Sequence, residues 1–124
     1  MPTEWDPDSK PVVTFDLQTE ISAFLVFRQL RNGRPMMLVD VRQGTVTHTL
    51  EGAIRWSEDF EPPADKTVVL FDEDGTLAVP LARRYQAAGV AHVKALFGGL
   101  DLWKFSLDPD VVGEATYLIE VKEP

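Results

Sequence analysis

Short apolar runs alternate along the chain with segments whose apolar residues recur at helical spacing. The runs 36–39 and 67–71 are almost wholly apolar, which is typical of strands buried on both faces of a sheet. The complete set of predicted strands is 11–15, 36–39, 53–56, 67–71, 90–96 and 117–119. Because helical segments separate most of these strands, the pattern predicts a single α/β domain with a mostly parallel sheet and helices on both faces.

The predicted helices lie between these strands. Asp16 is expected to cap a helix that begins at Leu17 and ends at Asn32-Gly33. A second helix is expected to run through Leu77, Leu81, Tyr85 and Ala88 and to end at Gly89, and a third begins after Gly98-Gly99 and carries Leu100, Trp103 and Leu107. Residues 43–52 have no assignable pattern, and 58–66 are expected to form a loop.

Length and charge limit the function classes. The 124 residues support one domain, 1–124, with 1–11 as a loose lead-in and 108–124 as a C-terminal extension. Twelve basic against 20 acidic residues give a net charge of −8, which repels phosphate backbones and anionic lipid. We therefore expect no nucleic-acid or membrane partner and leave a protein partner open. The acidic, proline-broken N-terminus is unlike a signal peptide, so we expect a cytoplasmic protein.

Four short motifs resemble those of the rhodanese-like domain. In chain order they are Leu38-Val39-Asp40-Val41-Arg42, Gly52-Ala53-Ile54, the strand–loop–helix 67–89, and Phe97-Gly98-Gly99-Leu100-Asp101-Leu102-Trp103. The resemblance spans residues 16–107. It implies a five-stranded parallel sheet between helices, with the active-site loop after the fourth strand. It also implies that the second and fourth strands are neighbours, which would bring Asp40 close to that loop.

The chain departs from active rhodanese-like sulfurtransferases within that loop. In such enzymes the loop begins with a cysteine that carries sulfur as a persulfide, and its N–H groups and an arginine hold the anionic substrate. Here Asp72 stands at the cysteine position, Leu77 at the arginine position, and Thr49 where a histidine is usual. The degenerate loop reads Asp72, Glu73, Asp74, Gly75, Thr76 and Leu77. The chain has no cysteine and a carboxylate forms no persulfide, so sulfur transfer is excluded.

A second, local resemblance offers an alternative. The segment 68–77 is similar to the first motif of haloacid-dehalogenase-type phosphatases. That resemblance implies Asp72 as nucleophile, Asp74 as general acid/base and a bound Mg²⁺. The family's later serine or threonine, lysine and acidic pair are missing, and too few residues follow to supply them.

The acidic residues at the strand ends have two interpretations. Asp72 can replace the cysteine structurally, by accepting hydrogen bonds from loop N–H groups near a helix N-terminus. Alternatively, Asp40, Asp72 and Asp74 can form a site for Mg²⁺ or Ca²⁺, with Arg42 neutralising part of the charge. His48 and His92 are expected at the surface or at strand ends.

The sequence therefore predicts a rhodanese-like α/β domain with no resident cofactor and no sulfurtransferase activity, serving as a binding or regulatory module. The alternatives are a Mg²⁺-dependent phosphohydrolase that uses Asp72 and Asp74, and a structural domain that docks elsewhere.

Overall fold

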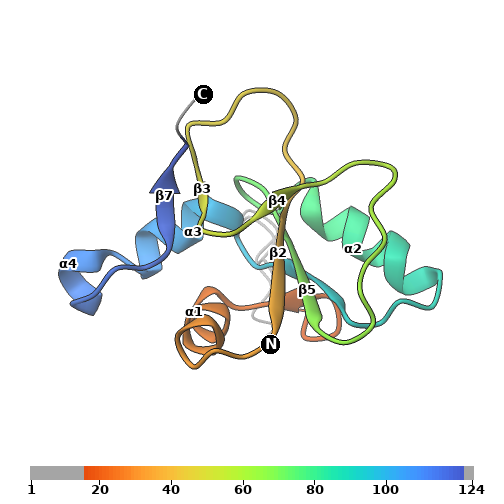
Figure 1. The fold of residues 1–124 in the computed structure, drawn as a ribbon, viewed down its shortest axis with the longest axis horizontal. Coiled ribbons are helices and arrows are strands. Elements are labelled where there is room, and N and C mark those ends of the chain that lie inside the picture. Colours follow the sequence, from red (N-terminus) through yellow and green to blue (C-terminus); the bar gives the residue numbers. More distant parts are fainter. Residues whose placement is uncertain (1–15, 122–124) are drawn as a thin grey trace, which may run out of the picture.

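A five-stranded parallel sheet forms the centre of the computed structural model, which describes residues 16–121 (Figure 1). Its strands are β1 (Glu20–Ile21), β2 (Met36–Asp40), β4 (Ile54–Arg55), β5 (Thr67–Phe71) and β6 (Val93–Leu96). They are arranged in the order β1-β6-β5-β2-β4, and every pair is parallel. The predicted α/β architecture is confirmed. The strand predicted at 11–15 lies outside the described residues.

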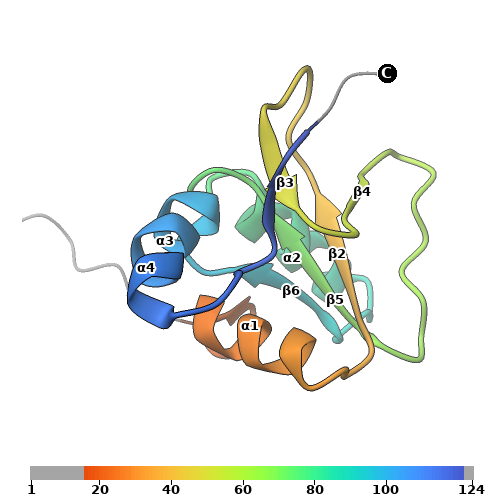
Figure 2. The same ribbon diagram turned by 60° about the vertical axis from the view of Figure 1, so that its left-hand side comes forward.

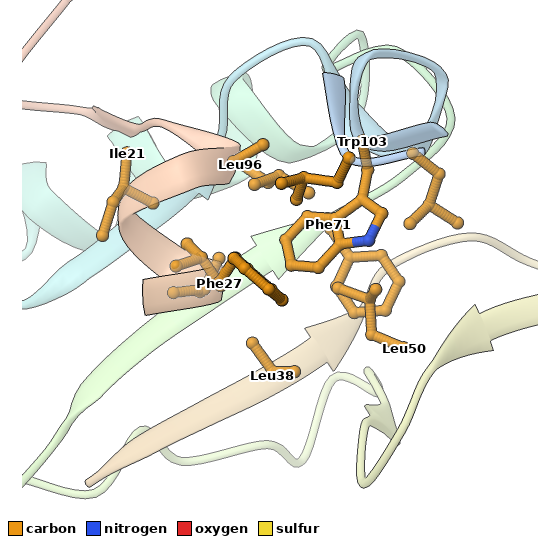
Figure 3. Close-up of a cluster of buried hydrophobic side chains, with 12 residues drawn as sticks. Ile21, Phe27, Leu38, Leu50, Phe71, Leu96 and Trp103 are labelled. Atoms are coloured by element: carbon orange, nitrogen blue, oxygen red, sulfur yellow. The ribbon is translucent and has the colours of Figure 1, made fainter. Parts of the chain in front are cut away.

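The central strand β5 separates two apolar clusters. Its side chains alternate, so that Val69 and Phe71 face one cluster while Val68 and Leu70 face the other. All four are fully buried, as the continuous apolar run predicts. In the first cluster Phe71 lies beside Trp103 (Figure 3). Burial of each such side chain contributes ~1.5–3 kcal/mol relative to exposure.

Helices cover both faces of the sheet, as Figure 2 shows. The helices α1 (Ala23–Arg31) and α3 (Gly99–Ser106) pack on the face of the Phe71 cluster, and α2 (Ala78–Ala87) packs on the opposite face. Each connection returns the chain to the same end of the sheet, because all five strands run in parallel. Within residues 16–121, no helix is long and apolar enough to cross a membrane.

The predicted start of the first helix is wrong. Asp16 does not cap a helix: its carboxylate accepts a hydrogen bond from the Gln18 N–H in a turn, and the chain then forms β1. The true cap is Ser22, whose hydroxyl accepts the Leu25 N–H at 3.1 Å. Pairing of β1 with β6 in the sheet outweighs the helical spacing of Leu17 and Ile21.

The buried face of α2 consists of small residues. Ala78 and Ala82 are fully buried against the sheet, whereas Leu77 is 52% exposed just before the helix begins. Leu81 and Tyr85 are only partly buried at the margin of that cluster. Small residues at the contact allow the helix to lie close to the sheet, so the larger apolar side chains are displaced to its edges.

A small second sheet holds the C-terminal part of the described chain. It pairs β3 (His48–Leu50) with β7 (Leu118–Glu120) in antiparallel fashion. The four-residue helix α4 (Pro109–Val112) comes shortly before β7 in the chain. The indole N–H of the buried Trp103 donates to the Thr116 carbonyl at 3.0 Å. The prediction of Trp103 as a core residue is therefore confirmed. The β3 strand falls in the segment that the sequence left unassigned.

Candidate functional site

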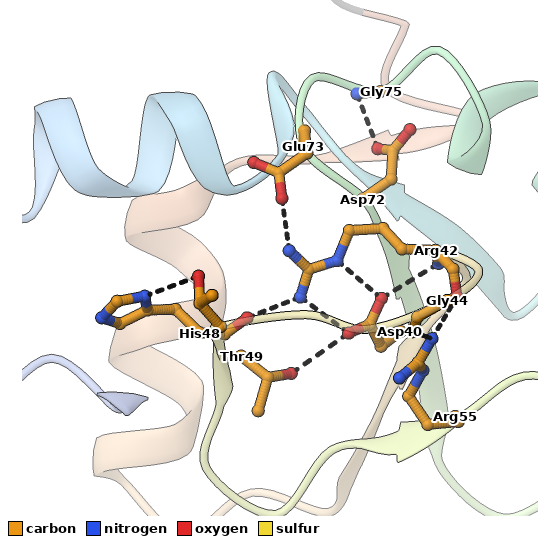
Figure 4. Close-up of polar contacts among 10 residues, drawn as sticks. Asp40, Arg42, Gly44, His48, Thr49, Arg55, Asp72, Glu73 and Gly75 are labelled. Atoms are coloured by element: carbon orange, nitrogen blue, oxygen red, sulfur yellow. Dashed lines mark hydrogen bonds and ion pairs between the residues drawn. The ribbon is translucent and has the colours of Figure 1, made fainter. Parts of the chain in front are cut away.

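Asp40 lies at the C-terminal end of β2 and is held by an arginine two residues later. Its carboxylate is fully buried, and it receives Arg42 Nε at 2.9 Å and Nη2 at 2.8 Å (Figure 4). The Arg42 N–H and the Thr49 hydroxyl also donate to it, at 3.0 and 3.4 Å. The two-pronged contact fits the planar guanidinium to the carboxylate and neutralises its charge inside the protein.

Arg42 connects this carboxylate to the loop after β5. Its Nη1 donates to the Glu73 carboxylate and its Nη2 to the His48 carbonyl at 2.6 Å. The hydrogen bond to Asp40, followed by that to Glu73, raises the pKa of the Arg42 guanidinium above its ordinary value. The predicted neutralising role of Arg42 is confirmed, and the same side chain ties β2, β3 and the loop together.

Asp72 begins the β5–α2 loop, defined here as residues 72–77, and the residue is 2% exposed. One oxygen accepts the Gly75 N–H and the other accepts the Leu77 N–H, both at 2.6 Å. Gly75 has φ +97°, a conformation that disfavours other residues and lets its N–H point into the loop. The loop therefore wraps its N–H donors around its own first side chain.

The N-terminus of α3 shapes this loop from outside. The Leu100 N–H donates to the Asp72 carbonyl at 2.9 Å, and the Asp101 N–H donates to the Glu73 carbonyl at 2.8 Å. A Cβ atom added at Gly99 would lie 2.5 to 2.6 Å from loop backbone atoms, so only glycine fits there. Free N–H groups of a helix N-terminus can bind anions; these two bind the loop backbone instead.

The remaining loop residues face solvent. Asp74 is exposed, and its carboxylate accepts the Thr76 N–H at 3.0 Å. Hydrogen bonds from the side chain and then the backbone of Thr76 lower the pKa of Asp74 below its ordinary value of 3.8. Together with Glu73 and the half-exposed Leu77, these residues form the rim of the loop.

The structure gives each carboxylate of the predicted cation site separate partners. Asp40 binds Arg42, Asp72 binds loop N–H groups, and Asp74 binds Thr76. Among residues 16–121, no three acidic or histidine side chains are grouped so that they could hold a metal ion. The cation site therefore stays a prediction without support from this arrangement. A nucleophilic role for Asp72 also lacks support, because both of its oxygens are engaged.

The two histidines lie in different parts of the fold. His48 is in β3 and contacts the Thr47 hydroxyl at 3.2 Å, while His92 precedes β6 and contacts the Pro63 carbonyl at 2.6 Å. Two groups near the site were not predicted from the sequence. One is the His48 carbonyl, which accepts from Arg42, and the other is Arg55, which donates to the Arg42 and Gly44 carbonyls. Backbone acceptors leave no mark in a sequence pattern, so neither role could be found there.

Solved structures provide the comparison for this arrangement. A rhodanese-related protein from Thermoplasma volcanium matches with a TM-score of 0.55 and 14% identity, over 82% of this chain and 97% of the other. The fold is rhodanese-like. A Lactobacillus plantarum protein (TM-score 0.61, 22% identity, 73% of this chain and 86% of the other) has the same fold. A Bacillus halodurans protein also has this fold, with a TM-score of 0.59 and 18% identity over 73% of this chain and 74% of the other. No protein-family model and no curated protein matches the chain.

The rhodanese-like fold identifies what the β5–α2 loop corresponds to. It follows the fourth strand of the main sheet in chain order, where the resemblance places the active-site loop. The expected adjacency of the second and fourth strands is also confirmed, since Asp40 is paired in register with Phe71. Asp72 therefore stands at the first position of this loop, whose N–H donors enclose its carboxylate.

Proposed function

We propose that this chain is a non-catalytic rhodanese-like domain that acts as a protein-binding or regulatory module through the rim of the β5–α2 loop. One observation carries the proposal: the Asp72 carboxylate accepts the N–H groups of Gly75 and Leu77. Those donors would otherwise be available to an anionic substrate. A buried carboxylate in the same place excludes a second anion by repulsion, which is ~4 kcal/mol at 4 Å and an effective dielectric constant of 20.

The rim supports a binding role because it presents unusual side chains for a former anion site. Leu77 is 52% exposed and lies where an arginine would hold substrate. It borders a groove of about 400 Å³ whose apolar walls include Trp56, Pro80 and Leu81. A groove of this kind suits a protein side chain better than an inorganic anion.

Photo-crosslinking in the organism from which the chain derives tests this role. The crosslinker p-benzoylphenylalanine is placed at Leu77 or, as a matched control, at Val111, which is 81% exposed on α4. We expect a discrete crosslinked adduct from position 77 and none from position 111. Equal labelling at both positions, or no adduct at 77, would contradict a rim-specific partner. An adduct at 111 alone would favour a structural domain that docks elsewhere.

A further inference from the structure

A second groove runs beside the β5–α2 loop, on the side of α3. It has a volume of about 640 Å³, and its apolar walls include Val79 of α2 with Leu102 and Phe105 of α3. Asp74 and Gly75 of the loop also line it. We call this hollow the loop–α3 groove.

Phe105 gives the groove an exposed aromatic wall. Its side chain is 83% exposed, whereas Trp103, two residues earlier on the same helix, is fully buried in the core. Single exposed apolar residues are common on protein surfaces. Phe105 differs because it lies on the same hollow as Leu102 and Val79, so that an inserted side chain would be covered from several sides.

The charges around the groove are predominantly negative. Among the described residues that line it, Asp74 and Asp101 contribute exposed carboxylates, Glu20 contributes a buried one, and Arg83 is the one basic residue. The Arg83 guanidinium is already 3.8 Å from the Asp16 carboxylate, which reduces the positive charge that it offers to a ligand. An exposed carboxyl such as that of Asp74 is ionised at neutral pH, and hydrogen bonds from Thr76 lower its pKa further.

We propose that the loop–α3 groove binds a segment of a partner protein in which a large apolar side chain is flanked by lysine or arginine. This inference rests on the proposed function and names the chemistry of its partner. A second copy of this chain is a poor occupant, because each copy has a net charge of −8. A nucleic acid is also disfavoured, since the groove carboxylates repel phosphate.

The two parts of the ligand have different tasks. The apolar side chain moves out of water into the groove, where it contacts Phe105, Leu102 and Val79. This contact supplies most of the affinity. The basic flanks meet Asp74 and Asp101, which accelerates association and rejects neutral or acidic segments. Binding should therefore weaken as ionic strength rises, because the carboxylates are exposed.

Peptide selection tests the inference directly. Random twelve-residue peptides displayed on phage are selected on the full chain, and enriched peptides are synthesised and titrated by fluorescence anisotropy. The test variants are Phe105→Ala and Asp101→Lys. The matched controls are Val111→Ala, at a residue equally exposed on α4, and Asp65→Lys, at an exposed loop residue outside the groove.

We expect enriched peptides to combine lysine or arginine with phenylalanine, tryptophan or leucine. Removing the aromatic wall should weaken binding about tenfold, and reversing the Asp101 charge should weaken it about three- to tenfold. Both controls should bind within about twofold of the parent. Peptides without a basic excess, or affinities unaffected by the two test variants, would overturn the inference.

The outcomes separate this inference from the proposed function. If Leu77→Glu weakens the affinity for the selected peptides and the groove variants do not, the rim remains a binding surface. That result would refute the loop–α3 groove as the site. Failure to enrich any peptide would also refute the inference, whereas the adduct at position 77 decides the proposed function independently.

Discussion

Two carboxylates are buried at the ends of neighbouring strands, and the protein stabilises them by different means. Asp40 is fully buried at the end of β2 and is matched by the guanidinium of Arg42. Asp72 is 2% exposed after β5 and is matched by backbone N–H groups at 2.6 Å. The first arrangement cancels the charge with a counter-ion, and the second retains the charge but surrounds it with dipoles.

The difference explains why one residue organises the site and the other closes it. Arg42 still has donors left after binding Asp40, and it uses them to hold Glu73 and the His48 carbonyl. Asp72 uses up donors: each of its oxygens takes one loop N–H. The Arg42 counter-ion therefore links several segments of the chain. The Asp72 carboxylate instead makes its hydrogen bonds within its own loop.

The largest expected effect comes from removing the counter-ion. Arg42→Met leaves Asp40 charged and unpaired in the interior, which should lower the free energy of unfolding by ~3–5 kcal/mol. Urea unfolding measures this, with Arg84→Ala as the control because Arg84 is an exposed arginine whose ion pair with Glu58 is also exposed. Adding Asp40→Asn to the variant should restore part of the loss. An Arg42→Met protein as stable as the control would show that the ion pair is not needed.

Asp72→Cys should lower stability by less than Arg42→Met does, and it should not create sulfurtransferase activity. The thiol is a weak acceptor, so the N–H groups of Gly75 and Leu77 lose their partners at a cost of ~1–3 kcal/mol. Asp72→Asn keeps one acceptor oxygen and should lose less. Thiocyanate formation from thiosulfate and cyanide should equal the no-protein blank for the parent and for Asp72→Cys, because Glu73, Asp74 and Leu77 still provide no cationic cradle. Turnover by either protein would refute our interpretation of the loop.

The smallest expected effect is that of divalent cations. A bound ion would relieve any repulsion among Asp40, Asp72 and Asp74 and stabilise the fold by ~2.7 kcal/mol at a hundred times its Kd. Because each carboxylate already has its own partner, we expect the melting temperature to be the same with and without millimolar Mg²⁺ or Ca²⁺. A rise that disappears in Asp72→Asn would establish the cation site and justify phosphatase assays.

The parts of this comparison that the sequence predicts are those set by local pattern. The apolar runs identify β2 and β5, and their alignment in a parallel sheet brings the end of β2 beside the loop. A structural acceptor is one of the two interpretations of Asp72 that the sequence allows, and the hydrogen bonds from the Gly75 and Leu77 N–H groups favour it. The extra contacts of Arg42 do not follow, because a flexible side chain can reach several partners and the three-dimensional arrangement selects among them.

Long-range pairing accounts for the other differences. The helical spacing around Leu17 is overridden because Glu20 and Ile21 pair with β6, which comes more than 70 residues later. Similarly, β3 forms only because β7 returns to pair with it. Neither pairing is encoded by composition within a short window. Local propensity is a weak guide where a two- or three-residue strand depends on a distant partner.

The close contact at Gly99 has a consequence for how this loop can evolve. The backbone of the β5–α2 loop is moulded against α3, and any side chain at position 99 would collide with Glu73 and Asp72 backbone atoms. The conformation of the loop is thus fixed by a neighbour as well as by the contacts of Asp72 within the loop. A side chain exposed to solvent on this loop can change without altering the backbone, whereas position 99 tolerates almost no change. The backbone shape of this loop can therefore stay the same while the side chains that it presents to solvent are replaced.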